Sequence, residues 1–268
     1  MLRNHRNLYF TLAFAGLALA ACNKEEVDSE TQSATDNSMA ETEFAMVFST
    51  SNNIVIREPG TKKILNECYT ITAPDTTDPW PRVLTIDFGT GCLGDDGRLR
   101  SGQIKVTITG PWNEYKSQIT AELVNYYVNL QKHTGTLTAI NQTAPGANTR
   151  TFDINVDNAS IVTDQGTIQW ESSRTIEWLS GFDTDTVKTD DIFEVTGSAN
   201  GTNRKGKTYE VKVTSPIRMD GSCDWITSGV LELTPEGLST RTVDFGDKTC
   251  DNKATVTIKG KSYEITMQ

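Results

Sequence analysis

The sequence predicts an all-β protein: a large twisted antiparallel meander, curled or folded as a sandwich or an open barrel. Threonine is the commonest of the 268 residues, and β-branched residues favour strands. Apolar and polar residues alternate with a period of two in many runs, and turn sequences such as Asn200-Gly201 separate those runs. These signals indicate roughly 13 to 15 short strands and no convincing amphipathic helix after the first twenty residues.

The alternation places one apolar and one polar face on each strand. Phe152, Ile154 and Val156 share a face, and Val256 and Ile258 do the same near the C-terminus. A sheet with one face packed on an apolar core and the other exposed to solvent is typical of antiparallel β proteins.

The first residues form a targeting signal. Arg3 and Arg6 precede an apolar stretch from Leu8 to Leu19, which is too short to span a bilayer. The stretch ends in Leu19-Ala20-Ala21-Cys22, a match to the bacterial lipobox. We therefore expect residues 1–21 to be removed and Cys22 to carry the lipid that anchors the chain in a membrane. The alternative is an ordinary secretory signal with a stray cysteine.

Residues 22–43 read as the lipidated cysteine followed by a disordered acidic tether, because polar residues dominate the segment. Within it, Asn23-Lys24-Glu25-Glu26 resembles the export signal that places lipoproteins of Bacteroidota on the outer face of the outer membrane. The alternative is that these acids merely begin the tether. We expect an outer-membrane, lipid-anchored protein that faces the cell exterior.

Residues 44–268 are expected to form a single β domain, although residues 44–66 fit strands or a short helix equally well. Two separate domains are the alternative, because the sequence contains an internal duplication at 68–110 and 223–260. Both copies run from a cysteine through Asp-Phe-Gly to a second cysteine and a Val-Thr-Ile strand.

The duplication also bears on the disulfides. Beyond Cys22 the chain has Cys68, Cys92, Cys223 and Cys250, which allow three pairings in an exported protein. The symmetry of the copies favours Cys68–Cys92 and Cys223–Cys250, one bridge at each end of the domain. The alternative is that the two copies are cross-linked to each other.

Trp170, Arg174 and Trp178 are the candidate ligand-binding residues, because they lie on one face of a predicted strand. Two indoles beside a guanidinium could stack on the rings of a glycan. The alternative is that both tryptophans pack in the core, as they usually do in strands. Thr76 and Thr186 are candidate O-glycosylation sites, since each follows an aspartate in a short Asp-Thr motif.

Several other functions are disfavoured. A net charge of −10 argues against nucleic-acid binding. Gly89 to Gly94 matches a dinucleotide-binding pattern but leads into Asp95-Asp96-Gly97, a turn and not a helix. The turn aspartates lack the spacing of a calcium loop, and we expect no metal and no cofactor. No residue is predicted to be catalytic, and a glycosidase would need two carboxylates from different strands.

Several segments resemble a family of uncharacterised Bacteroidota outer-membrane lipoproteins. They are TIDFGTGC ending at Cys92, NYYVN at 125–129, SRTIEW at 173–178, DDIFEVTG at 190–197 and the C-terminal DFGDKTCDNKATVTIKGKSYEIT. The resemblance implies the compartment and a shared β fold but no activity. We therefore expect a non-enzymatic protein that binds a glycan or an envelope protein, or supports the envelope. A carbohydrate-active enzyme and a periplasm-facing lipid carrier are the alternatives.

Overall fold

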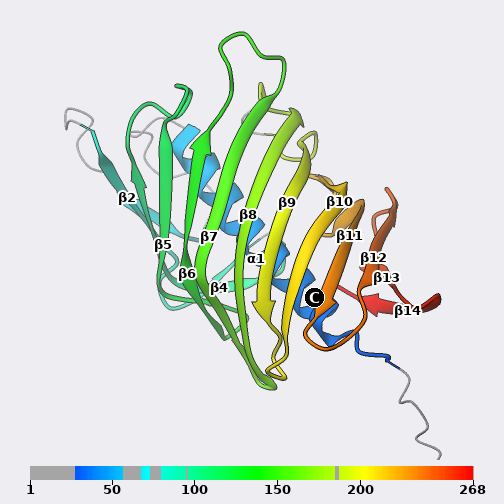
Figure 1. The fold of residues 1–268 in the computed structure, drawn as a ribbon. Coiled ribbons are helices and arrows are strands. Elements are labelled where there is room, and N and C mark those ends of the chain that lie inside the picture. Colours follow the sequence, from blue (N-terminus) through cyan, green and yellow to red (C-terminus); the bar gives the residue numbers. More distant parts are fainter. Residues whose placement is uncertain (1–27, 57–67, 73–79, 95, 185–186, 268) are drawn as a thin grey trace, which may run out of the picture.

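In the part of the chain that the structure describes, the fold is one long, curled antiparallel sheet with a single helix against its inner face (Figure 1). The computed structural model describes residues 28–56, 68–72, 80–94, 96–184 and 187–267. The elements are α1 (Gln32–Ile56), β1 (Thr70–Thr72), β2 (Arg82–Asp87), β3 (Cys92–Leu93), β4 (Leu99–Ile108), β5 (Gln118–Val128), β6 (Gln131–Asn141), β7 (Arg150–Thr163), β8 (Gly166–Ser180), β9 (Ile192–Thr202), β10 (Thr208–Asp220), β11 (Ile226–Pro235), β12 (Arg241–Asp247), β13 (Lys253–Ile258) and β14 (Lys261–Thr266).

The strands follow one another in the sheet in chain order, which confirms the predicted meander. The order is β1-β2-β4 and onward to β14, with β3 added beside β4. Every described pairing is antiparallel, and the sheet is open, with β1 and β14 at its edges. The described residues form one sheet with a shared apolar core.

β-Bulges give the sheet its curvature. Gly102 and Gly135 lie at breaks in strand register, opposite bulged segments that contain Asn125 and Asn158. Both asparagines have a positive φ, which asparagine tolerates better than most residues. Such bulges bend a strand and increase its local twist. The sheet therefore curls toward α1, which runs diagonally behind β7 to β10 in Figure 1.

The helix corrects two expectations. Residues 32–43 belong to α1 and not to a disordered tether, and the undecided residues 44–56 continue the same helix. Its apolar residues include Ala40, Phe44 and Phe48, at the four-residue spacing that a helix needs. Its first half is polar yet buried, because the inner face of the sheet offers cations and N–H donors there. Local composition could not reveal those partners.

The duplicated modules adopt the same local structure at the two ends of the sheet. Phe88 and Phe245 are both buried. The N–H of Gly89 donates to Asp87 Oδ1 (2.8 Å), and the N–H of Gly246 donates to Asp244 Oδ1 (2.9 Å). Both Asp-Phe-Gly sequences are therefore strand ends in which the aspartate closes the turn.

The predicted disulfides are confirmed. Cys68 is bonded to Cys92 and Cys223 to Cys250, one bridge in each module. Each bridge closes a loop of about 25 residues, which stabilises the fold by about 3 kcal/mol in the chain-entropy model. In the described part of the chain, α1 is the only helix, and it lacks the apolar stretch that a bilayer crossing requires.

We predict that the bulge at Gly102 is essential to the curvature. Gly102 (φ +82°) and Gly206 (φ +83°) have nearly the same φ, but a Cβ at Gly102 would lie 1.9 Å from the carbonyl oxygen of Asn125. A Cβ at Gly206 meets nothing within 4 Å. Gly206→Ala should lower the free energy of unfolding by about 1 kcal/mol, and Gly102→Ala by at least about 3 kcal/mol. Denaturant titration measures both, and equal losses would contradict the prediction.

Candidate functional site

Trp170 and Arg174 are buried against α1, and Trp178 is buried against Phe182 and Phe193. This corrects the expectation that the three side chains are exposed and stack on a glycan. Trp170, Arg174 and Trp178 share the inner face of β8, as the alternation predicts, but each has an exposed fraction of 4% or less. Trp170 Nε1 donates to Asn37 Oδ1 (3.0 Å) and its ring stacks on Phe44. The residues form part of the core, which was the alternative interpretation.

Arg174 is held by α1. Its Nε and Nη2 donate to the two carboxylate oxygens of Glu41 at 3.0 and 2.6 Å. Both side chains are at least nine-tenths buried. A paired arrangement of this kind is the strongest hydrogen-bonding geometry available to arginine, and it leaves no free face for a glycan.

Similar ion pairs continue along the helix. The pairs between the sheet side and the N-terminal part of the chain are Arg241 with Asp28 and Glu30, Arg204 with Asp36, Arg174 with Glu41, and Arg98 with Glu43. The helix is therefore fixed by charge as well as by apolar contact. Buried charges are tolerated in proteins when they are paired in this way.

His133 also faces the helix. Its Nε2 lies 3.6 Å from Glu43 Oε2, and its Nδ1 lies 2.9 Å from the carbonyl oxygen of Gln131. Burial lowers the pKa of His133, against the opposing effect of the Glu43 carboxylate. The histidine therefore favours its neutral form and has a structural place in the core.

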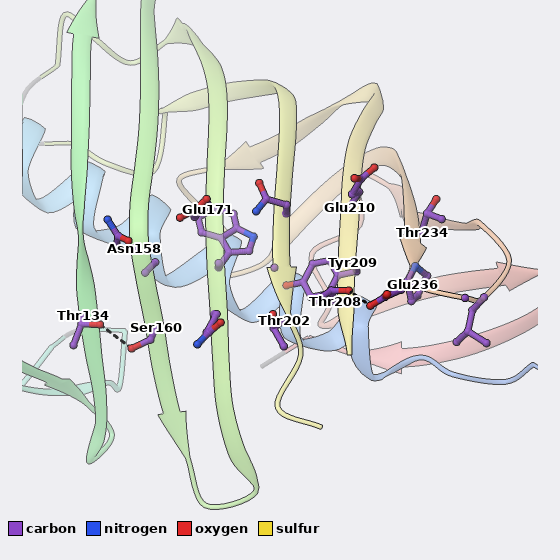
Figure 2. Close-up of a pocket in the computed structure, with 18 residues that line it drawn as sticks. Thr134, Asn158, Ser160, Glu171, Thr202, Thr208, Tyr209, Glu210, Thr234 and Glu236 are labelled. Atoms are coloured by element: carbon purple, nitrogen blue, oxygen red, sulfur yellow. Dashed lines mark hydrogen bonds between the residues drawn. The ribbon is translucent and has the colours of Figure 1, made fainter. Parts of the chain in front are cut away.

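The candidate site is a depression of about 800 Å³ on the opposite, outer face of the sheet, and Figure 2 shows the residues that line it. It spans β6 to β11 and the turn after β11. Its outer-face residues form two rows that run across adjacent strands. One row is Thr134, Ser160, Gln169, Thr202, Thr208 and Glu236, and the other is Asn158, Glu171, Asn200, Glu210 and Thr234.

The second row places two carboxyl groups on either side of an amide. Asn200 pairs with Glu171 on one neighbouring strand and with Glu210 on the other. Strands in a sheet lie about 4.8 Å apart, so the backbones that carry the two glutamates are about 10 Å apart. Both glutamate side chains are exposed, and the amide between them offers a donor and an acceptor.

The first row supplies hydroxyl and amide groups. Thr134 and Ser160 share a hydrogen bond of 2.7 Å, and Thr208 donates to Glu236 Oε2 (2.7 Å). Together the rows present hydroxyl, amide and carboxylate groups on a rigid surface. Such a set can form many hydrogen bonds with a polar ligand that carries its own hydroxyl groups.

The sequence did not predict this site, and it predicted a turn at Asn200-Gly201, which instead lies inside β9. The rows exist only because β7, β8, β9 and β10 are neighbours in a fixed register. A usable signal was present in the polar faces of consecutive strands, such as Gln169 and Glu171 beside Asn200 and Thr202. Combined with the predicted meander, those faces would have indicated a continuous polar surface.

Outside the depression, the loop before β9 contains Asp191, a carboxyl group whose pKa is raised. Asp191 Oδ1 accepts a hydrogen bond from Trp178 Nε1 (3.1 Å). Burial raises the pKa of Asp191 to about 6, Asp190 adds to the rise, and the hydrogen bond from Trp178 opposes it. This carboxyl group is therefore near the point of protonation at mildly acid pH.

The other predicted sites lie outside the described residues: the lipidation site Cys22 and the glycosylation candidates Thr76 and Thr186. Within the described ranges, no three histidine, cysteine or acidic side chains come together as a metal site. No protein-family model, curated protein or solved structure matches the chain. The resemblance to Bacteroidota lipoproteins stays a prediction.

We predict that the pair between Arg174 and Glu41 is needed for stability. Arg174→Ala leaves a buried carboxylate without its partner and should lower the free energy of unfolding by about 3 to 5 kcal/mol. Lys105→Ala is the control, because it breaks an exposed pair with Glu122 (3.7 Å) and should cost less than about 1 kcal/mol. Urea titration compares them, and a small loss for Arg174→Ala would disprove the structural role.

We predict that Asp191 makes stability fall as pH rises from about 4 to 6. Because its folded pKa of about 6 exceeds the ordinary value of 3.8, the folded state holds a proton that the unfolded state has released. Asp191→Asn should remove this dependence and stabilise the protein at pH 7 by about 1 kcal/mol, since the half-buried site is partly screened by water. Thermal unfolding across this pH range tests it, with the exposed Asp183→Asn as the charge control.

Proposed function

We propose that this protein is a lipid-anchored, non-enzymatic binding protein of the bacterial outer membrane, exposed at the cell surface, and that its outer sheet face binds a glycan. The anchor rests on the lipobox that ends at Cys22, and surface exposure rests on the acidic residues that follow it. An envelope protein is the alternative partner for the same face.

The depression on the outer face is the observation that carries the proposed ligand class. It is open, wide enough for several sugar units, and lined on its outer side by hydroxyl, amide and carboxylate groups. Long strands hold these groups at fixed spacing, so little conformational entropy is lost on binding. The inner face is already filled by α1, so we do not propose that it carries lipid.

Glycoside hydrolysis is a second candidate, and the positions of Glu171 and Glu210 favour it. An inverting glycosidase needs two carboxyl groups about 6.5 to 9.5 Å apart, a spacing that side chains on next-but-one strands can reach. If the protein hydrolyses a glycan, Glu171→Gln should abolish product release while binding persists. Release of reducing sugar measures this activity.

We predict that glycan binding depends on Asn200 and Glu210. In calorimetric titration against a panel of soluble polysaccharides, at least one should bind the wild-type protein. Asn200→Ala and Glu210→Gln should each weaken that binding about tenfold by removing hydrogen bonds to the ligand. Glu232→Gln is the matched control, because Glu232 is exposed on β11 outside the depression. Failure of every polysaccharide, or equal affinity of all variants, would refute the glycan proposal.

We predict that protease treatment of intact cells releases peptides of this protein. Cys22→Ser should move the protein from the membrane fraction to the soluble fraction, because the thiol that accepts the lipid is lost. Immunoblotting of the fractions measures the anchor, and mass spectrometry of the released peptides measures exposure. Peptides that appear only after lysis would leave the anchor in place but put the protein on the periplasmic side.

A further inference from the structure

The end of the sheet at which α1 begins has several properties of a membrane-facing surface. We call it the anchor end, and define it by β3, the start of β4 and the turns at 129–130, 164–165, 203–207, 236–240 and 259–260. Alternate turns of an antiparallel meander lie at one end of the strands, and Arg241 beside Ile258 brings the last two turns together. Figure 1 shows the turn between β7 and β8 and the start of α1 at the same lower edge.

The chain enters the described structure at this end. Asp28 Oδ2 accepts hydrogen bonds from Arg241 Nη2 (2.8 Å) and from the N–H of Ser239 (3.3 Å). Asp28 is six residues from Cys22. A fully extended chain spans at most about 3.5 Å per residue, so a lipid on Cys22 keeps this end within about 20 Å of the bilayer.

Exposed leucines lie on the same end, at the other side of the sheet. The exposed fractions are 83% for Leu130, 66% for Leu93 and 38% for Leu99. The three are neighbours, because Leu93 pairs with Leu99, and Leu99 exchanges hydrogen bonds with Asn129 (2.8 and 2.9 Å). Val162, beside the next turn, is 43% exposed.

Leu130 has a backbone conformation that is unfavourable for leucine. Asn129 and Leu130 form the two-residue turn between β5 and β6, with φ values of +49° and +68°. Such turns favour glycine at the second position, and leucine adds strain there. The exposed side chain contributes little to the core in return. An unfavourable backbone that displays an apolar side chain to solvent points to a contact outside this chain.

The charges are divided between the two ends. In the turns and the β3–β4 loop of the anchor end, the exposed or half-buried lysines are Lys205, Lys207 and Lys259, and the acids are Asp164, Glu236 and Asp96, of which Asp96 is paired with Arg100. At the opposite end, the turns hold the acids Glu114, Asp183, Asp190, Asp191, Asp224 and Asp251 and the lysines Lys116, Lys188 and Lys248. An anionic surface therefore repels the opposite end more strongly than the anchor end, which favours an orientation with the anchor end toward that surface.

We infer that the anchor end rests on an anionic lipid bilayer, with Leu93, Leu99 and Leu130 entering the headgroup region. This inference rests on the proposed lipid anchor. The described chain begins at Asp28 beside β12, and the leucines lie near β4 and β5, so the start of the tether and the leucines lie on opposite sides of the sheet. Two separated contacts fix the tilt of the sheet, which a single lipid does not. The acidic end then points away from the membrane.

The test uses the mature lipidated protein in vesicles of phosphatidylethanolamine and phosphatidylglycerol. Leu130→Cys supplies a thiol for a nitrobenzoxadiazole label, because the four cysteines of the described structure are in disulfides. Ala147→Cys, in an exposed turn at the opposite end, is the matched control. Binding to the vesicles should shift the emission of the label at position 130 to the blue, because the headgroup region is less polar than water, and nitroxide lipids should quench it. The label at 147 should show neither change.

Mass spectrometry of Cys22 separates the two proposals. If the cysteine carries no lipid, the proposed anchor fails and the inference falls with it. If the lipid is present but the labels at 130 and 147 are quenched equally or not at all, the inference alone is overturned.

Leu130→Gly provides an independent test. It should raise the midpoint of thermal unfolding, because glycine relieves the strained turn, and it should reduce quenching of a label placed at Leu93→Cys. A fall in the midpoint would assign Leu130 to the fold and contradict the inference, as would unchanged quenching.

Discussion

The fold depends on the match between buried arginines of the sheet and carboxylates of the N-terminal segment. Arg174 and Arg241 project from the inner face of the sheet, where water cannot reach them. A buried guanidinium without a counter-charge would destabilise the sheet by several kcal/mol. Glu41 and Asp28 remove that cost, so α1 belongs to the core of the protein and is not an accessory to it.

The curvature of the sheet gives its two faces different roles: the inner face packs against α1, and the outer face stays in solvent. Bulges beside Gly102 and Gly135 bend the strands around α1, which completes the inner face. The outer face then has no part in packing, and its polar side chains are free for contacts with other molecules. The depression around Asn200 therefore lies on a surface that the fold itself does not use.

The sequence predicts the sheet better than it predicts the site. The period of two correctly puts Trp170, Arg174 and Trp178 on one face, and the duplication correctly pairs the cysteines, because both signals are local or repeated. The helix that covers this face was not predicted. The residues at and before its start are polar, and they are ordered by distant partners such as Arg241, which is 213 residues from Asp28. The rows around Asn200 escaped for a related reason, as they require the register of four strands.

The pairing of Asp28 with Arg241 also constrains the order of folding. The helix and the residues just before it are the first part of the described chain to be synthesised, but their partners extend to β12, the twelfth strand. Contacts so distant in sequence form late, because a long loop must close before they stabilise anything. The start of α1 can therefore lock in place only when the meander has reached β12. The N-terminal segment therefore becomes fully ordered only in a chain that is nearly complete: a chain that stops before Arg241 leaves Asp28 and Glu30 without their cation.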